Sequence, residues 1–312
     1  MAATLRIELV EYRYQSPRTG AWMSMYDVVV KVVDDCFAFV PTAACRALIL
    51  GVLGRALQLF PHIDCYGFHV MSNHMHLLIG ARTLREKSSY LAWTLREISK
   101  RFNKLLGRTG SLLEQNRCTQ VVSPEHALQR LRYLMGQATA QFLVRHPDDD
   151  FFPCSTPALL HGGAIPATFS YAGQEPLDCP VRIDRLPGLE ALTPRAHRDL
   201  MWQLADGLAA EARPRRKKAG TRIPDPETIR RLDPRTRPRV RTRSPKPVIH
   251  GDAEHIEAWH EAHAAARDAY TLATRAFQRW HDDPSQPLLP WPPNTLPPAF
   301  ARTRCAVGAG TG

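Results

Sequence analysis

The pattern of apolar and polar positions in the first third of the chain predicts an alternation of strands and helices. Residues 26–33 are apolar and β-branched, as is typical of a strand. Residues 41–61 carry apolar side chains at helical spacing between two prolines. Two short apolar runs, at 63–71 and 74–80, are separated only by a Ser-Asn dipeptide, which predicts a β-hairpin.

A second helix and a fourth strand follow the hairpin. Thr83 and Glu86 form a capping box, and the helix that it begins closes at Gly107. Residues 119–122 favour a short strand, and Ser123, followed by Pro and Glu, begins another helix. The order strand–helix–strand–strand–helix–strand is that of the split βαβ, ferredoxin-like layout. We therefore predict an α+β fold, with an antiparallel sheet and helices on one face.

The second half of the chain has a weaker pattern. Residues 147–200 mix Pro, Gly and polar residues, with a short helix expected at 194–208. A stronger helix runs from Asp252 to about His281, with apolar positions three and four apart. That spacing suits docking on another helix or self-pairing, but Ala and His at several of these positions favour packing onto the chain's own core. Residues 284–298 are Pro-rich and predict an extended tail.

The excess charge of this chain of 312 residues is confined to one stretch. Fourteen basic residues and three acidic ones lie between Arg213 and Lys246, a difference that equals the net charge of +11 of the whole chain. Because this stretch is rich in Pro and poor in apolar residues, we predict an extended arm. Such an arm suits contact with a polyanion such as nucleic acid, and the alternative is a solvated spacer.

The cysteines and the hydropathy limit the class of protein. The seven cysteines are scattered and form no Cys-x-x-Cys pair, which argues against a disulfide framework or a Cys-based zinc site. No signal-peptide pattern opens the chain, and its most apolar window, residues 47–60, is broken by Arg55 and is too short to span a bilayer. We therefore expect a soluble cytoplasmic protein without a membrane partner.

Candidate chemistry lies in the hairpin and in the helix that begins at Ser123. Residues two apart on a strand face the same side, so His74 and His76 project together, about 7 Å apart at the backbone, and can converge on one divalent ion. By itself a His-x-His pair does not define a metal site. On the helix, Tyr133 and Gln137 lie one turn apart and off the apolar stripe. The alternative for Tyr133 is a packed aromatic ring with its hydroxyl at the surface.

Three segments resemble the single-tyrosine HUH transposases, which include the REP-associated tyrosine transposases. VMSNHMHLLI, at 70–79, is similar to their His-hydrophobic-His motif, which commonly reads MPNHxHLL. LREISKRFNKLLGRTG, at 95–110, resembles their next segment. RLRYLMGQATAQ, at 130–141, resembles their tyrosine helix, in which Gln or Asn follows the tyrosine by four residues. Ser72 replaces a frequent Pro, and ATAQ follows Gln137 where REP-associated members commonly have Asn and Pro.

The resemblance implies a specific chemistry on single-stranded DNA that carries a hairpin. Tyr133 would be the catalytic nucleophile, forming a 5′-phosphotyrosine and a free 3′-hydroxyl. His74, His76 and Gln137 would hold a divalent metal, Mg²⁺ or Mn²⁺. The strand would then be cleaved and rejoined. Related transposases often act as dimers, whereas REP-associated ones can act alone, so a homodimer and a monomer both stay open.

The resemblance covers roughly residues 25–160, and composition and charge suggest how the rest of the chain is divided and where DNA lies. We expect an N-terminal segment (1–24), an HUH transposase-like catalytic domain (25–160), an irregular or helical connector (161–212), the basic Pro-rich arm (213–250) and a mainly helical C-terminal extension with a Pro-rich tail (251–312). The candidate DNA contacts are basic residues after the hairpin, before the last strand and in the arm: Arg96, Lys100, Arg101, Lys104, Arg117, Arg215, Arg216, Lys217 and Lys218.

Two other functions remain open at this point. One is a catalytically inert or domesticated nucleic-acid-binding protein that relies on the basic arm. The other is a replication initiator or relaxase with the same chemistry. Relaxases usually carry their tyrosine nearer the N-terminus, and no helicase motif follows here, so we favour the transposase.

Overall fold

The computed structural model describes residues 8–171, 174–238, 248–293, 295, 297, 298 and 301. The chain divides into two compact units. Tyr12–His250 form the larger unit, and the described parts of Met1–Glu11 and Gly251–Gly312 form the smaller one.

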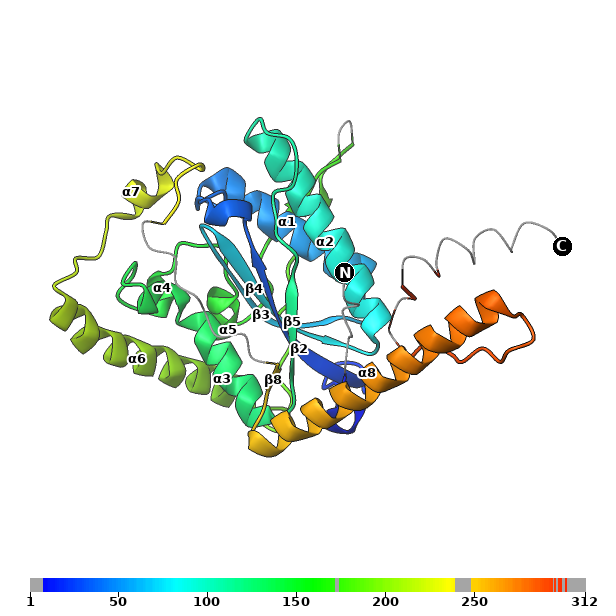
Figure 1. The fold of residues 1–312 in the computed structure, drawn as a ribbon. Coiled ribbons are helices and arrows are strands. Elements are labelled where there is room, and N and C mark those ends of the chain that lie inside the picture. The colour runs from blue at the N-terminus through cyan, green and yellow to red at the C-terminus, as the bar shows by residue number, and fades with distance from the viewer. Residues whose placement is uncertain are drawn as a thin grey trace. The chain divides into compact units, whose positions relative to one another are not determined.

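A mixed sheet lies at the centre of the larger unit (Figure 1). Its order is β3-β4-β2-β5-β8, and the short β1 pairs with the outer part of β2. All neighbours in this order are antiparallel except β8, which runs parallel to β5. The predicted wholly antiparallel sheet is therefore wrong at one edge, where a two-residue strand from beyond the basic stretch is added. The strands are β1 (Tyr14–Gln15), β2 (Trp22–Lys31), β3 (Asp64–Met71), β4 (His74–Ala81), β5 (Arg117–Val121) and β8 (Ile249–His250).

Helices α1 (Ala43–Leu59) and α2 (Leu84–Leu105) cover one face of the sheet (Figure 1). Both begin at a capping threonine, which the sequence predicted for α2: Thr42 accepts a hydrogen bond from the Cys45 amide, and Thr83 accepts one from the Glu86 amide. Apolar burial on this face fixes which side of each strand points away from it. The core between the two helices and the sheet includes Val28, Val30, Met75, Leu77 and Ile79.

The opposite face is covered as well, by α3 (Pro124–Met135), α4 (Gln137–Ala140), α5 (Thr156–His161) and α6 (Pro194–Ala219). Leu131 and Leu134 of α3 and Met201 of α6 share a second core with Tyr66 and Leu78 of the sheet. The prediction of helices on one face is therefore wrong. The central strands bury apolar side chains on both faces, and the chain after residue 123 supplies the second layer.

The helix α6 is longer than predicted and takes in the start of the basic stretch. It continues through Ala219 and ends at Gly220, which adopts a left-handed conformation with φ of 62°. The residues at 215–219 are good helix formers, so 213–219 are helical although Pro214 lies among them. A short helix, α7 (Pro226–Arg230), follows. The expected extended arm is thus wrong for these parts, and residues 239–247 lie outside the described residues.

The smaller unit is built on α8 (Ala253–Asp282), which matches the helix predicted from Asp252 to about His281. Asp252 and His255 form a capping box at its start. Trp291 of the Pro-rich tail packs against Tyr270 and Phe277, so the tail folds back onto the helix at this point.

The remaining short elements of the described chain are β6 (Thr168–Phe169), β7 (Leu177–Asp178), and the 3-10 helices η1 (Val10–Tyr12), η2 (Val33–Asp35) and η3 (Pro147–Asp149).

In the described parts of the chain, no helix is both long enough and apolar enough to cross a membrane.

Candidate active site

The two histidines of the hairpin lie together on the α3 face of the sheet. Met75, between them, is buried in the core against α1 and α2, so alternation along β4 turns His74 and His76 the other way. Their ring centroids are 5.1 Å apart, with the planes at 84°. His76 is only 4% exposed, whereas His74 is partly buried at the start of the strand.

Tyr133, near the end of α3, reaches the same place from the helical layer. Its ring meets the His76 ring edge to face, with centroids 5.4 Å apart and planes at 79°. Leu131 and Leu134, on either side of it in sequence, anchor α3 in the second core. Tyr133 itself is 45% exposed, so it touches a buried imidazole on one side and is open to solvent on the other.

Gln137 completes the group from α4. The helical path is interrupted at Gly136, the C-terminal cap of α3, and Gln137 begins the next short helix. The Gln137 side-chain Nε2 donates to the Tyr133 carbonyl oxygen at 3.2 Å, and the same side chain acts to raise the pKa of His74. The structure thus brings together all four residues that the sequence singled out for nucleophile and metal roles.

A buried carboxylate, which the sequence patterns did not single out, lies behind His76. Asp27 of β2 is 2% exposed, and its Oδ2 forms an ion pair with Arg130 at 2.7 Å and a hydrogen bond with His250 Nε2 at 3.1 Å. Its Oδ1 lies 3.9 Å from His76 Nδ1. Burial alone raises the pKa of Asp27, but His250, His76 and Arg130 outweigh it and hold that pKa well below its usual range. The signal in the sequence was an acidic residue inside an apolar strand.

Burial keeps both imidazoles neutral. It lowers the pKa of His74 to about 3, and it also lowers the pKa of His76 although Asp27 acts against it. His74 Nδ1 lies 2.7 Å from Asn73 Oδ1, an arrangement in which Nδ1–H donates and Nε2 keeps its lone pair. Neutral imidazole nitrogens and an amide oxygen are ligands for a divalent cation. The residues present therefore fit the ion that the resemblance implies.

Arg130 adds a positive charge beside the tyrosine. Its guanidinium carbon lies 4.2 Å from the centroid of the Tyr133 ring, which is a cation–π contact. The same side chain is paired with Asp27, and its buried Nε has no hydrogen-bond partner within the described chain. Arg130 thus links the nucleophile candidate to the carboxylate behind His76.

The candidate DNA contacts are distributed over the whole unit. Arg101 of α2 is engaged in packing, because it stacks on Phe169 at 3.8 Å and pairs with Glu97. Arg117 begins β5 opposite Val29 of β2, and Val29 is in turn opposite His76, so Arg117 shares the face of the histidines. The α2 candidates lie on the layer that covers the other face of the sheet, away from Tyr133: Arg96, Lys100, Arg101 and Lys104.

The basic residues of the predicted arm occupy the end of α6. Arg216 lines a cavity of about 400 Å³, which Arg145 and Arg222 also line, so three arginines surround it. Because α6 packs against α3, α4 and α5, this cluster lies on the same face of the sheet as Tyr133. The neighbours of Arg216 that are exposed at this end of the helix are Arg215, Lys217 and Lys218.

Comparison with known proteins gives a match of low structural similarity. No protein-family model matches the chain, and no curated protein matches it. Among solved structures, the chain is similar to one described as "Structure of the REP associates tyrosine transposase bound to a REP hairpin". The two are 13% identical with a TM-score of 0.37, over 50% of this chain and 82% of that one. Evidence for the function therefore comes from the residues of the site itself.

Proposed function

We infer that this protein is a DNA-processing enzyme of the single-tyrosine HUH type, a transposase that cleaves and rejoins single-stranded DNA. The observation that carries the inference is the edge-to-face contact of Tyr133 with His76, at 5.4 Å, in a group that also holds His74 and Gln137. The order β3-β4-β2-β5, with α1 and α2 as the crossovers, supports a ferredoxin-like core for this site.

Each residue of the candidate site has a separate proposed role. Tyr133 presents a phenol to solvent and would attack the scissile phosphorus. His74, His76 and the Gln137 amide oxygen would hold Mg²⁺ or Mn²⁺. The chemistry that a bound divalent cation supplies there is Lewis-acid polarisation of the scissile phosphate. Arg130, against the Tyr133 ring, would favour the phenolate and the negative phosphate beside it.

The proposed step conserves the energy of the bond that it breaks. Tyr133 Oη forms a bond to phosphorus while the bond from phosphorus to the 3′-oxygen breaks. The phenolic proton is lost to solvent, and the 3′-oxygen gains a proton to become a hydroxyl. A second 3′-hydroxyl can reverse the reaction on the phosphotyrosine, so rejoining requires no ATP. His74, His76, Tyr133 and Gln137 all belong to one chain, and a homodimer stays a prediction.

The test is covalent capture of a labelled strand. A hairpin-bearing single-stranded oligonucleotide is incubated with the protein and Mn²⁺ or Mg²⁺, and the mixture is separated under denaturing conditions. A 3′-terminal label is expected to shift to the mass of the protein, and a 5′-terminal label to remain on a shortened free strand. Tyr133→Phe should remove the adduct, whereas Tyr171→Phe, at another exposed tyrosine, should retain it. An adduct of equal yield with Tyr133→Phe would overturn the proposal.

The same experiment separates catalysis from simple binding. An inert protein that relies on its basic residues binds the oligonucleotide without an adduct, and His76→Ala leaves its behaviour unchanged. The enzyme loses the adduct with His76→Ala or with EDTA while it retains affinity for the strand. The adduct is read on the denaturing gel, and affinity for the strand is read on a native gel of the same mixtures.

A further inference from the structure

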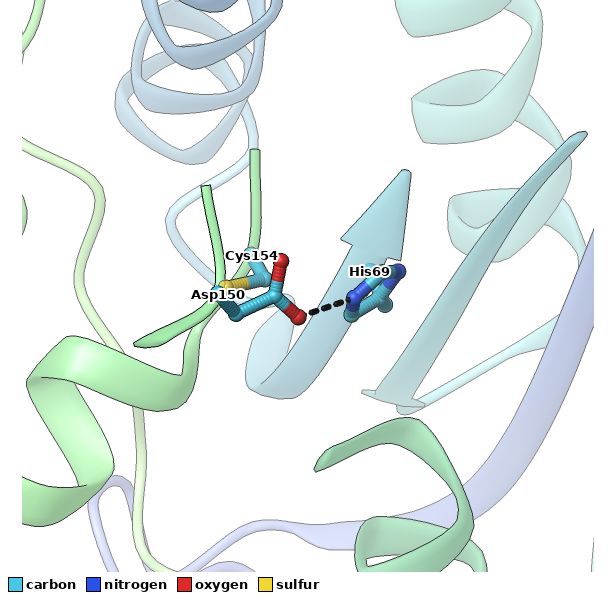
Figure 2. Close-up of side chains that lie close together, drawn as sticks. All are labelled: His69, Asp150 and Cys154. Carbon is cyan, nitrogen blue, oxygen red and sulfur yellow. Dashed lines mark hydrogen bonds and ion pairs between the residues drawn. The ribbon is translucent and has the colours of Figure 1, made fainter. Parts of the chain in front are cut away.

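A second group of ligand-type side chains lies beside the candidate active site, buried between β3 and the segment before α5. It consists of His69, Asp150 and Cys154, and one ligand atom from each lies within 4.8 Å of the other two (Figure 2). His69 Nε2 is 2.7 Å from Asp150 Oδ2. The His69 and Asp150 side chains are 0% and 1% exposed, and Cys154 is 0% exposed.

The backbone holds these donors in a fixed arrangement along the edge of β3. Hydrogen bonds join the strand to residues 153 and 155: the Val70 amide donates to the residue-153 carbonyl at 2.9 Å, and the residue-155 amide donates to the Phe68 carbonyl at 2.9 Å. Cys154 is thereby the bridge partner of His69. The Asp150 carboxylate is oriented in turn by the backbone amide of residue 152, which donates to Oδ1 at 2.9 Å. Preorganised donors of this kind suit a ligand that binds without rearrangement of the chain.

The buried negative charge of Asp150 favours a cation in this group. Asp150 is a buried carboxylate, and within the described chain it pairs with His69 rather than with Lys or Arg. The other nitrogen of that ring, Nδ1, is buried and has no hydrogen-bond partner among the described residues. A cation that replaces the hydrogen between His69 and Asp150 would therefore break no other hydrogen bond of the ring. It would also give the buried carboxylate a full opposite charge.

We propose that His69, Asp150 and Cys154 form a zinc-type metal site, separate from the ion of the His74 and His76 pair. Imidazole nitrogen, carboxylate oxygen and cysteine sulfur are the usual ligands of Zn²⁺. A thiolate selects Zn²⁺ over Mg²⁺ and Mn²⁺, which prefer oxygen. On binding, the Cys154 thiol gives up its proton to solvent and the sulfur becomes the ligand. The scattered cysteines of the sequence argue against a zinc site built on paired cysteines, whereas the set proposed here needs only one cysteine.

The site has a structural consequence for the candidate active site. His69 is paired across the hairpin with His76, so their side chains share one face of the sheet. An ion on His69 would fasten residues 150–154 to β3 and hold that strand in register beside β4. The role is to position the hairpin, and it requires no catalysis at His69.

The test uses the sulfur ligand, because the His74 and His76 site has none. The full chain is purified without chelator and analysed for metals, and we expect about one zinc per chain. Replacement with Co²⁺ should give the near-ultraviolet charge-transfer absorption of a cobalt–thiolate bond. Cys154→Ala should remove this band, whereas Cys45→Ala, at another buried thiol on α1, should leave it.

Each result decides one proposal. Wild-type protein that binds Co²⁺ without a thiolate band overturns the site, and this holds even if Cys154→Ala fails to fold. A thiolate band that survives in Cys154→Ala overturns it too. His76→Ala should lose the DNA adduct and keep the thiolate band. If the band is present and no adduct forms in wild type, the zinc site stands and the proposed transposase activity falls.

Discussion

At the scale of single residues, the carboxylate of Asp27 faces His76, with Oδ1 3.9 Å from Nδ1, and we expect its charge to help hold the imidazole in place. Asp27→Asn keeps the size of the side chain and removes the charge that faces His76, Arg130 and His250. If His76 binds the metal as proposed, loss of such an outer partner typically costs about 10- to 100-fold in metal affinity or activity. We therefore expect adduct formation to need more Mn²⁺ and to slow by roughly 10-fold or more.

The measurement is the rate of adduct formation as a function of Mn²⁺ concentration. Asp199→Asn, at an exposed position of α6, is the control and should behave as wild type. Equal metal dependence in Asp27→Asn and wild type would show that His76 does not need this carboxylate.

Arg130 and Arg132 offer a matched pair on the same helix. Arg130 contacts the Tyr133 ring and Asp27, whereas Arg132 pairs with Glu211 of α6. Arg130→Gln removes the positive charge beside the proposed nucleophile, and we expect the rate of adduct formation to fall by about 10-fold or more. Arg132→Gln should change the rate little, because Arg132 pairs with Glu211 instead of contacting Tyr133. The protein should also stay folded, since exposed ion pairs contribute about 1 kcal/mol or less to stability. Single-turnover rates at saturating metal distinguish the two, and equal slowing of both variants would count against a role for Arg130.

At the scale of elements, the sequence predicted what local rules decide. The hairpin at residues 72–73, the caps at Thr83 and Ser123, and the start of α8 all rest on side chains within three residues of one another. The interruption of the helix at Gly136 depends instead on a residue far away in the sequence. A Cβ there would lie 2.7 Å from Leu208 Cδ2 of α6, so a helix about seventy residues later is packed against that backbone. No periodicity within α3 encodes this packing.

The candidate site shows the same division between local and distant information. Strand alternation places His74 and His76 on one side of the sheet, and helical spacing places Tyr133 and Gln137 one turn apart. That the two pairs form one site is what the family resemblance implied. The network around Asp27 forms only when β2, α3 and β8 meet, because His250 arrives from the far side of the basic stretch. The second helical layer was not predicted for the same reason, since it packs through contacts far apart in sequence.

Close packing of α1 against a later segment gives a prediction about stability. A Cβ on Gly54 would lie 1.7 Å from the Cys179 carbonyl oxygen, a backbone atom that cannot move aside cheaply. We expect Gly54→Ala to lower the free energy of unfolding by about 1–3 kcal/mol. Gly207→Ala is the control: it lies in α6 with open space around it, and Ala there should stabilise by roughly 0.5–1 kcal/mol. Urea unfolding followed by circular dichroism measures both, and a Gly54→Ala protein as stable as wild type would contradict the packing.

At the scale of the whole molecule, the two layers of helices divide the basic residues between the faces of the sheet. The α6 cluster (Arg215, Arg216, Lys217 and Lys218) lies on the Tyr133 side, and the α2 cluster (Arg96, Lys100 and Lys104) lies on the other side. A strand that reaches Tyr133 can therefore pass the end of α6 without crossing the sheet. Alanine at all four α6 positions should weaken single-stranded DNA binding. It should also reduce the slope of log affinity against log salt by about 0.7 for each phosphate that the variant no longer neutralises.

The α2 cluster supplies the matched control for this prediction. Its replacement by alanine removes three positive charges, so net charge alone would weaken binding almost as much as the α6 change does. If position decides, the α2 variant keeps nearly the wild-type salt slope while the α6 variant does not. Fluorescence anisotropy of a labelled oligonucleotide over a range of salt concentrations separates the two. A larger decrease of the slope in the α2 variant would mean that DNA lies on the opposite face of the sheet. Tyr133 could not reach DNA bound there, and this result would contradict the proposed reaction.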